Sequence, residues 1–269
     1  MMRPVKRSRL RICIGKCYYT VRRYISWIIE YRLFANRKDY VDMPYNVYEH
    51  STPIYRELVG VNLELLKNKE KNLRIAIKNL DGVVIEPRQK FSYWRLIGKP
   101  SIRKGYLPGM VLFYGNLTSG TGGGLCQLSN LIYWISLYTP LKVVERYRHS
   151  YDVFPDSNRT QPFGSGATCV YPYRDLQLYN DTDNCFQLRL KIMNGRLYGM
   201  INSDKPLLIS YMVYQKEHCI THELWGGYVR HNRIFRKEFD VNGRQLDDYE
   251  VTQNHAVMMY EPFLEKHYD

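Results

Sequence analysis

The chain has 269 residues, of which 45% are hydrophobic and 24% are charged, a composition typical of a globular protein that buries a core. No stretch reaches the about 18 to 20 uninterrupted apolar residues that a membrane-spanning helix needs. The composition therefore argues against a largely disordered chain and against an integral membrane protein, and the length suits one large domain or two small ones.

The net charge of +13 is concentrated at the N-terminus, where residues 1–40 contain eleven Lys and Arg residues against two acidic ones. The rest of the chain is nearly balanced, which does not favour nucleic acid as a partner, because such proteins spread cations over a folded face. Apolar residues recur at helical spacing from Tyr18 to Phe34. We expect residues 1–44 to form a basic helical arm. Two alternatives stay open: residues 1–40 contact an anionic membrane surface peripherally, or the arm packs on the body.

Arg22 and Arg23 interrupt the apolar part of the arm, so the sequence predicts no secretory signal peptide. Six cysteines are scattered along the chain: Cys13, Cys17, Cys126, Cys169, Cys185 and Cys219. Without an export signal we expect reduced thiols and a cytoplasmic protein, peripheral at the membrane if the arm binds there. No cysteine or histidine spacing matches a structural zinc site, and we predict neither a metal nor a cofactor.

Residues 45–269 are expected to form one α+β domain with a β-rich C-terminal part. Helical spacing predicts one or two helices over Leu58–Leu80 and a helix from Leu125 to Tyr138. Two Asn-Gly pairs predict hairpin turns at 194–195 and 242–243. The predicted strands and hairpins lie at 81–94, 106–117, 141–149, 167–171, 174–179, 186–193, 197–201, 207–214, 228–239 and 251–260, with a glycine-rich loop at 118–124 and an irregular loop at 155–166. The expected architecture is a central helix on a largely antiparallel sheet.

The glycine-rich loop ends in Gly122, Gly123 and Gly124, directly before Leu125 and Cys126. A phosphate-binding P-loop would need a lysine after the last glycine, and a dinucleotide fingerprint would need a glycine where Leu125 stands. The loop instead brings bare backbone to a helix start that has a thiol in its first turn. Free N–H groups and the positive helix end favour a thiolate there.

Downstream of Cys126, the sequence places His149 at the end of a predicted strand and Asp175 at the start of another. A thiol on a helix N-terminus, followed by an imidazole and a carboxylate on strands, is the order of papain-like and transglutaminase-like enzymes. We therefore predict Cys126 as nucleophile, His149 as base and Asp175 as the group that orients it, with Glu145 and Asp152 as alternative orienting acids. The alternative is that these residues have no catalytic role, with Cys126 a small buried side chain and His149 a surface residue.

Several neighbours of the thiol are candidate binding residues. The amides of the three glycines can form an oxyanion site, and Gln127 can donate to the same oxyanion. Ser129 and Asn130 lie about one turn after Cys126 and can line a groove, although helix polarity explains them as well.

Five segments together resemble the VanW family: Phe91-Ser-Tyr-Trp-Arg-Leu, Gly105-Tyr-Leu-Pro-Gly-Met, Ser119-Gly-Thr-Gly-Gly-Gly-Leu-Cys-Gln-Leu-Ser-Asn-Leu, Val144-Glu-Arg-Tyr-Arg-His-Ser and Asp175-Leu-Gln-Leu-Tyr-Asn-Asp-Thr. Gly164-Ser-Gly-Ala-Thr168 matches a further step of its pattern. The resemblance runs from Pro44 to Pro206. Members of the family accompany some vancomycin-type glycopeptide resistance clusters. The resemblance thus implies a link to the cell envelope but no settled biochemical activity.

Two hypotheses of function follow. The first is a cysteine-dependent amide hydrolase or acyl transferase acting on cell-wall precursor peptides. The second is a non-catalytic binding module for a cell-wall precursor, a glycopeptide-related ligand or an envelope partner.

Overall fold

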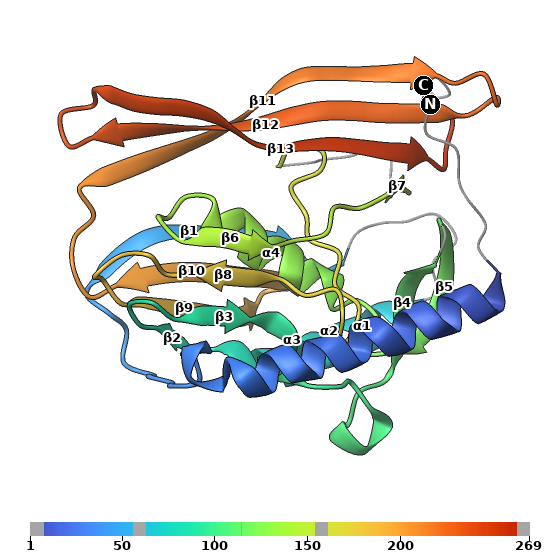
Figure 1. The fold of residues 1–269 in the computed structure, drawn as a ribbon, viewed down its shortest axis with the longest axis horizontal. Helices are drawn as coiled ribbons and strands as arrows, with labels where there is room; N and C mark the ends of the chain where they lie inside the picture. Colours follow the sequence, from blue (N-terminus) through green and yellow to red (C-terminus); the bar gives the residue numbers. More distant parts are fainter. Residues whose placement is uncertain (1–7, 56–62, 114, 154–160, 263–269) are drawn as a thin grey trace.

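The computed structural model describes residues 8–55, 63–113, 115–153 and 161–262 (Figure 1). The helices are α1 (Arg9–Ile29), α2 (Leu63–Leu80), α3 (Tyr93–Ile97) and α4 (Cys126–Ser136), with 3-10 turns η1 (Tyr31–Leu33) and η2 (Ile102–Lys104). The strands are β1 (Tyr45–Pro53), β2 (Val84–Ile85), β3 (Lys90–Ser92), β4 (Pro108–Phe113), β5 (Asn116–Thr121), β6 (Lys142–Glu145), β7 (Tyr151–Asp152), β8 (Gln177–Tyr179), β9 (Phe186–Met193), β10 (Arg196–Ser203), β11 (Ile209–His222), β12 (Tyr228–Asp240) and β13 (Gln245–Met258).

The centre of the molecule is α4 packed on an antiparallel sheet of order β1-β10-β9-β2. Gly199 of β10 lets the helix approach closely, because a Cβ there would lie 3.0 Å from the Leu131 side chain and 3.2 Å from that of Ile135. Leu128, Leu131 and Ile135 are fully or almost fully buried. The predicted α+β class, with a central helix on an antiparallel sheet, is therefore confirmed. The closer likeness to papain and transglutaminase stays a prediction.

A second antiparallel sheet, β11-β12-β13, lies on one side of this body, and α1 runs along the opposite side (Figure 1). The short strand β7 joins that sheet in parallel with β13. In the first sheet, Asn194 and Gly195 both have positive φ, of 52° and 68°, which is the conformation that a two-residue hairpin turn requires. The Asn-Gly signal thus identified the turn between β9 and β10 correctly.

Three predicted segments have another type of structure than expected. Tyr93 begins a helix instead of ending a strand, because Ser92 accepts the N–H of Arg95 at 3.3 Å and Asp175 accepts that of Trp94 at 2.9 Å. The first half of the predicted glycine-rich loop is strand β5, paired with β4. Residues 167–171 form no strand, and their first residues lie along α4.

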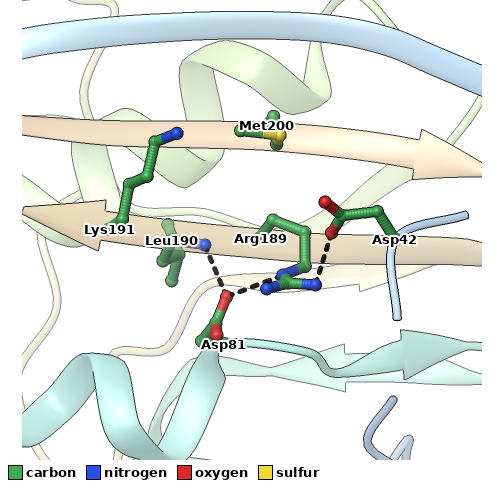
Figure 2. A pocket seen from close by; sticks show the side chains of 6 residues that line it. All are labelled: Asp42, Asp81, Arg189, Leu190, Lys191 and Met200. Atoms are coloured by element: carbon green, nitrogen blue, oxygen red, sulfur yellow. Dashed lines mark hydrogen bonds and ion pairs between the residues drawn. The ribbon is translucent and has the colours of Figure 1, made fainter. Parts of the chain in front are cut away.

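Two predictions lie partly outside the described residues: the helix start at Leu58, and residues 155–160 of the irregular loop predicted at 155–166. In the described residues, α2 begins at Leu63 and ends at Leu80, as predicted. Asp81 follows it and ties the helix end to β9, where its Oδ1 accepts from Leu190 N at 2.8 Å and pairs with Arg189 Nε at 3.1 Å (Figure 2).

The basic arm contains a longer helix than predicted, beginning at Arg9, where Ser8 accepts the N–H of Arg11 at 3.4 Å. After the helix, Phe34 and Ala35 are buried in the body, and Phe34 bridges to Lys90. In the described part of the chain, no helix has the length and apolar character to cross a bilayer. A domain boundary at residue 44 stays a prediction.

Candidate functional site

Cys126 is the first residue of α4, and it is exposed. Protein atoms nevertheless crowd its sulfur, and this desolvation raises the pKa of the Cys126 thiol, while the backbone N–H groups of Cys169 and of Cys126 itself act in the opposite direction. The exposed surface lets a reagent reach the residue, and the crowding disfavours the thiolate. The helix end alone therefore does not activate this thiol.

The three glycines before α4 are needed for close backbone packing. A Cβ on Gly123 would lie 2.0 Å from the backbone carbon of Gly109, and one on Gly124 would lie 2.4 Å from the Lys69 side chain. The amide of Gly122 donates to Leu107 O at 3.0 Å. The other two donate to the carbonyls of Gly120 and Met110 at 3.0 and 2.9 Å. All three amides already have carbonyl partners, so an oxyanion site formed by them stays a prediction that requires these bonds to open.

His149 lies in the connection between β6 and β7, beyond the end of the strand that was predicted to carry it. Its Nε2 is 3.2 Å from Asn130 Oδ1, and its Nδ1 is 2.8 Å from Thr168 Oγ1. Asn130 Oδ1 also accepts the N–H of Ala167 at 2.8 Å, which fixes it as an acceptor. In a neutral ring, Nε2 therefore carries the proton and Nδ1 accepts from the Thr168 hydroxyl.

Asn130 contacts His149 and lies on the same face of α4 as Cys126. Residues four apart on a helix share a face, so Asn130 lies one turn along α4 from Cys126. The chain from Gly166 to Cys169 runs beside this turn: Ser129 donates to Ala167 O at 2.8 Å, and Cys169 offers its N–H to the Cys126 sulfur. A thiol, an imidazole and a carboxamide thus line one end of α4.

Gly166 is required at this place. A Cβ there would lie 2.7 Å from Asn130 Oδ1 and 2.7 Å from His149 Nε2. Contacts that close do not occur, so any larger residue would displace the amide or the ring. The glycine of the Gly-Ser-Gly-Ala-Thr segment therefore serves the site itself.

Asp175 lies elsewhere, fully buried just before β8. Its carboxylate accepts from Ser92 Oγ at 2.5 Å, from the N–H groups of Trp94 and Leu176 at 2.9 Å each, and from Gln177 Nε2 at 3.2 Å. Desolvation raises its pKa to about 6, opposed chiefly by the hydrogen bonds from Ser92 and Trp94. Among the described residues Asp175 makes no hydrogen bond with His149, and Thr168 occupies the ring nitrogen that this acid was expected to hold.

The two alternative acids also have other partners. Glu145 forms an ion pair with Arg23 of α1 and accepts the N–H of Asp175 at 3.0 Å. Asp152 accepts from Arg230 at 3.2 Å and from the Tyr260 hydroxyl at 2.9 Å. Both carboxylates join distant parts of the fold.

The predicted binding residues Gln127 and Ser129 connect α4 to its surroundings. Gln127 Nε2 donates to Thr52 Oγ1 at 2.8 Å and to Pro53 O at 2.9 Å, which fastens the end of β1 to the helix. Ser129 is fully buried and donates to Ala167 O. A ligand-binding role for either side chain stays a prediction.

Arg146 is a site residue that the sequence analysis did not single out. Its guanidinium donates to Gly166 O at 2.9 Å and Gly164 O at 2.5 Å, and on β13 to Thr252 Oγ1 at 2.8 Å and Asn254 Oδ1 at 3.2 Å. It therefore holds the backbone that carries Gly166 against the second sheet. Its place three residues before His149 is the one local signal that could have identified it.

Two hollows are lined by other residues than those of this site. The hollow in Figure 2 is lined by Asp42, Asp81 and Arg189, whose charges are already paired with one another, together with Leu190, Lys191 and Met200. A hollow on the second sheet contains His231 and His255, whose Nδ1 atoms are 2.6 Å apart. Within the described ranges, no three His, Cys, Asp or Glu side chains gather as metal ligands.

Comparison with known proteins identifies relatives. The family model described as "VanW like protein" matches residues 68–202. The chain is 27% identical to the vancomycin B-type resistance protein VanW of Enterococcus faecalis (strain ATCC 700802 / V583) over 97% of its own length and 92% of that protein. It is 28% identical to the uncharacterized protein YoaR of Bacillus subtilis (strain 168) over 49% of its length and 42% of that protein. No solved structure matches. The chain belongs to the VanW family.

Proposed function

We propose that this protein is a cysteine-dependent hydrolase or acyl transferase that acts on an amide bond of a cell-wall precursor peptide. One observation carries the proposal: the exposed Cys126 starts α4 one turn before Asn130, whose amide oxygen is 3.2 Å from His149 Nε2. A reachable thiol with an imidazole nearby is the minimum for nucleophilic acyl transfer.

The reaction requires one proton to move twice. His149 takes the proton of the thiol, and the Cys126 sulfur bonds to the carbonyl carbon of the amide. The C–N bond then breaks, the nitrogen leaves with the proton from His149, and a thioester remains. Water or a second amine cleaves the thioester and regenerates the thiol. We propose the N–H of Cys126, at the positive end of α4, as a donor to the developing oxyanion.

In the neutral ring the nitrogen that can accept a proton is Nδ1, which receives a hydrogen bond from Thr168. The proposal therefore requires this bond to open when substrate binds. Catalytic hydrogen bonds are often completed only in the substrate complex.

The relatives support the proposed substrate class. The E. faecalis protein, which aligns with nearly the whole chain, is named a vancomycin B-type resistance protein. That name connects the family with an antibiotic of the cell envelope, and an envelope peptide with amide bonds suits a thiol nucleophile.

A non-catalytic binding module is the second candidate. Two observations favour it: both ring nitrogens of His149 already have partners, and desolvation raises the pKa of the Cys126 thiol. A groove with these properties can hold a peptide through hydrogen bonds without reacting with it.

Thiol labelling distinguishes the two candidates. Iodoacetamide modification of each cysteine is followed by peptide mass spectrometry from pH 6 to 9, with exposed Cys219 and buried Cys169 as internal references. If His149 is the base, Cys126 reacts faster than Cys219 at pH 7, and His149→Ala lowers the Cys126 rate about tenfold or more. The neighbouring Arg148→Ala is the matched control and leaves the rate unchanged. A slow Cys126 rate that is the same in all three proteins supports the binding module.

A further inference from the structure

Helix α1 exposes a continuous apolar stripe to solvent. Seven large apolar residues expose between 50% and 75% of their surface: Leu10, Ile14, Tyr18, Val21, Ile25, Ile28 and Ile29. Their spacings of 4, 4, 3, 4, 3 and 1 place them on one face of the helix. Apolar patches of this kind on a soluble protein mark an interaction surface.

The opposite face of α1 is attached to the body, which fixes the direction of the stripe. Arg23 forms an ion pair with Glu145, and only 11% and 20% of these two side chains are exposed. Nearer the C-terminal end, the hydroxyls of Tyr24 and Tyr171 are 2.8 Å apart, and the ring of Trp27 lies against the same tyrosine, with centroids 6.3 Å apart. These contacts prevent the helix from turning its apolar face inward. The stripe therefore points away from the protein.

The charges of α1 determine which partner fits. The helix has five basic residues and no acidic one. At about 100° per residue, Arg11 and Arg22 border the stripe on one side, whereas Arg9 and Lys16 lie on the far side of the helix; all four are exposed. An apolar face bordered by cations, on a helix with no acidic residue, complements an anionic lipid surface: the apolar side chains enter the acyl boundary and the bordering cations meet the headgroups. A second copy of α1 would bring like charges together.

We propose that α1 binds the protein to the surface of membranes that contain anionic lipid. The helix lies in the plane of the membrane over its length of about 32 Å, with the stripe directed into the bilayer and the body held above it. Because α1 and the second sheet lie on opposite sides of the body, β11–β13 faces away from the membrane (Figure 1). This inference is independent of the chemistry at Cys126.

Flotation of the full chain with lipid vesicles tests the proposal. We expect binding to vesicles of phosphatidylcholine with about 30% phosphatidylglycerol, at least tenfold tighter than to pure phosphatidylcholine, and weaker at high salt. Arg11→Gln with Arg22→Gln should weaken the binding about fivefold for each cation removed.

A matched pair of variants separates the stripe from net charge. Ile25→Glu with Ile28→Glu should weaken vesicle binding about a hundredfold, near tenfold for each isoleucine withdrawn. The control, Leu208→Glu with Leu224→Glu, makes the same charge change outside α1, at side chains that are 74% and 92% exposed. It should lose only the part of the vesicle affinity that comes from net charge. All four positions are exposed, so both proteins should keep the wild-type circular dichroism spectrum.

Three results would overturn the proposal. The first is a wild-type chain that does not float with anionic vesicles. The second is an equal loss of binding in the stripe variant and its control. The third is self-association in sedimentation experiments that the stripe variant abolishes while no vesicle binding is seen, because a second copy would then be the occupant.

Discussion

Replacing Gly166 with alanine should disturb the His149 site directly. Gly166 does not have a positive φ, so its backbone accepts an alanine without strain. The cost comes from contacts alone: the new Cβ would lie 2.7 Å from both Asn130 Oδ1 and His149 Nε2, and 2.9 Å from His149 Cδ2. Either the ring or the amide must move.

The magnitude follows from the bonds at risk. Moving Asn130 weakens its bonds to His149 and to the Ala167 amide, each worth about 1 kcal/mol. Overpacking a tight site adds about 1 to 3 kcal/mol. We therefore expect Gly166→Ala to lower the free energy of unfolding by about 2 to 5 kcal/mol.

Urea denaturation measures this change, with Gly120→Ala as control. A Cβ on Gly120 would meet only the Val111 side chain, at 3.1 Å, and its φ is not positive, so the control should stay within about 1 kcal/mol of wild type. In an Asn130→Ala background one of the two contacts is gone, and the cost of Gly166→Ala should shrink. The reasoning is refuted if Gly166→Ala costs no more than the control, or if its cost is the same in both backgrounds.

Two further predictions concern buried groups. Because the folded pKa of Asp175, about 6, lies above its ordinary 3.8, its ionisation destabilises the fold; its stabilising contribution is full below pH 3.8 and is lost as the pH rises through 6. From pH 4 to pH 7 the stability of wild type relative to Asp175→Asn should therefore fall by up to about 3 kcal/mol, measured by urea denaturation, and a constant difference would contradict this. Gly123→Ala should cost at least about 3 kcal/mol, because its Cβ would meet backbone of Gly109 at 2.0 Å. The control is Gly15→Ala in α1, which has open space around it and should leave the stability unchanged or raise it slightly. Equal melting temperatures of Gly123→Ala and Gly15→Ala would contradict the packing argument.

The sequence predicted best where local signals determine the structure. Strand β9 and the turn at Asn194-Gly195 were predicted with their observed bounds, because alternation and positive φ are local properties. Helix α4 was likewise found from its apolar spacing. In contrast, the helix that begins at Tyr93 has only a single local cap, Ser92, and depends also on Asp175, more than eighty residues away, which accepts the N–H of Trp94. The local alternation around Tyr93 therefore suggested a strand.

In the candidate site, too, the sequence predicted local properties better than long-range contacts. The glycines before Cys126 indicated a close approach of two backbone segments. The sequence did not show which segment packs against them, and in the structure this is the hairpin that contains Gly109. Order along the chain suggested Asp175 as the neighbour of His149, whereas Thr168 occupies that ring nitrogen. The roles of Cys126 and His149 in catalysis stay predictions that labelling can test.

The long-range hydrogen bonds of Arg146 affect which fragments of these proteins are suitable for assays. The matched family region ends at residue 202, yet two of the groups that Arg146 grips, Thr252 and Asn254, lie some fifty residues later. A fragment that ends with the matched family region would keep Cys126 and His149 but lose two of the four groups that accept hydrogen bonds from Arg146. Activity assays on such a minimal fragment would therefore report on an unsupported site, and a negative result would say nothing about the whole protein.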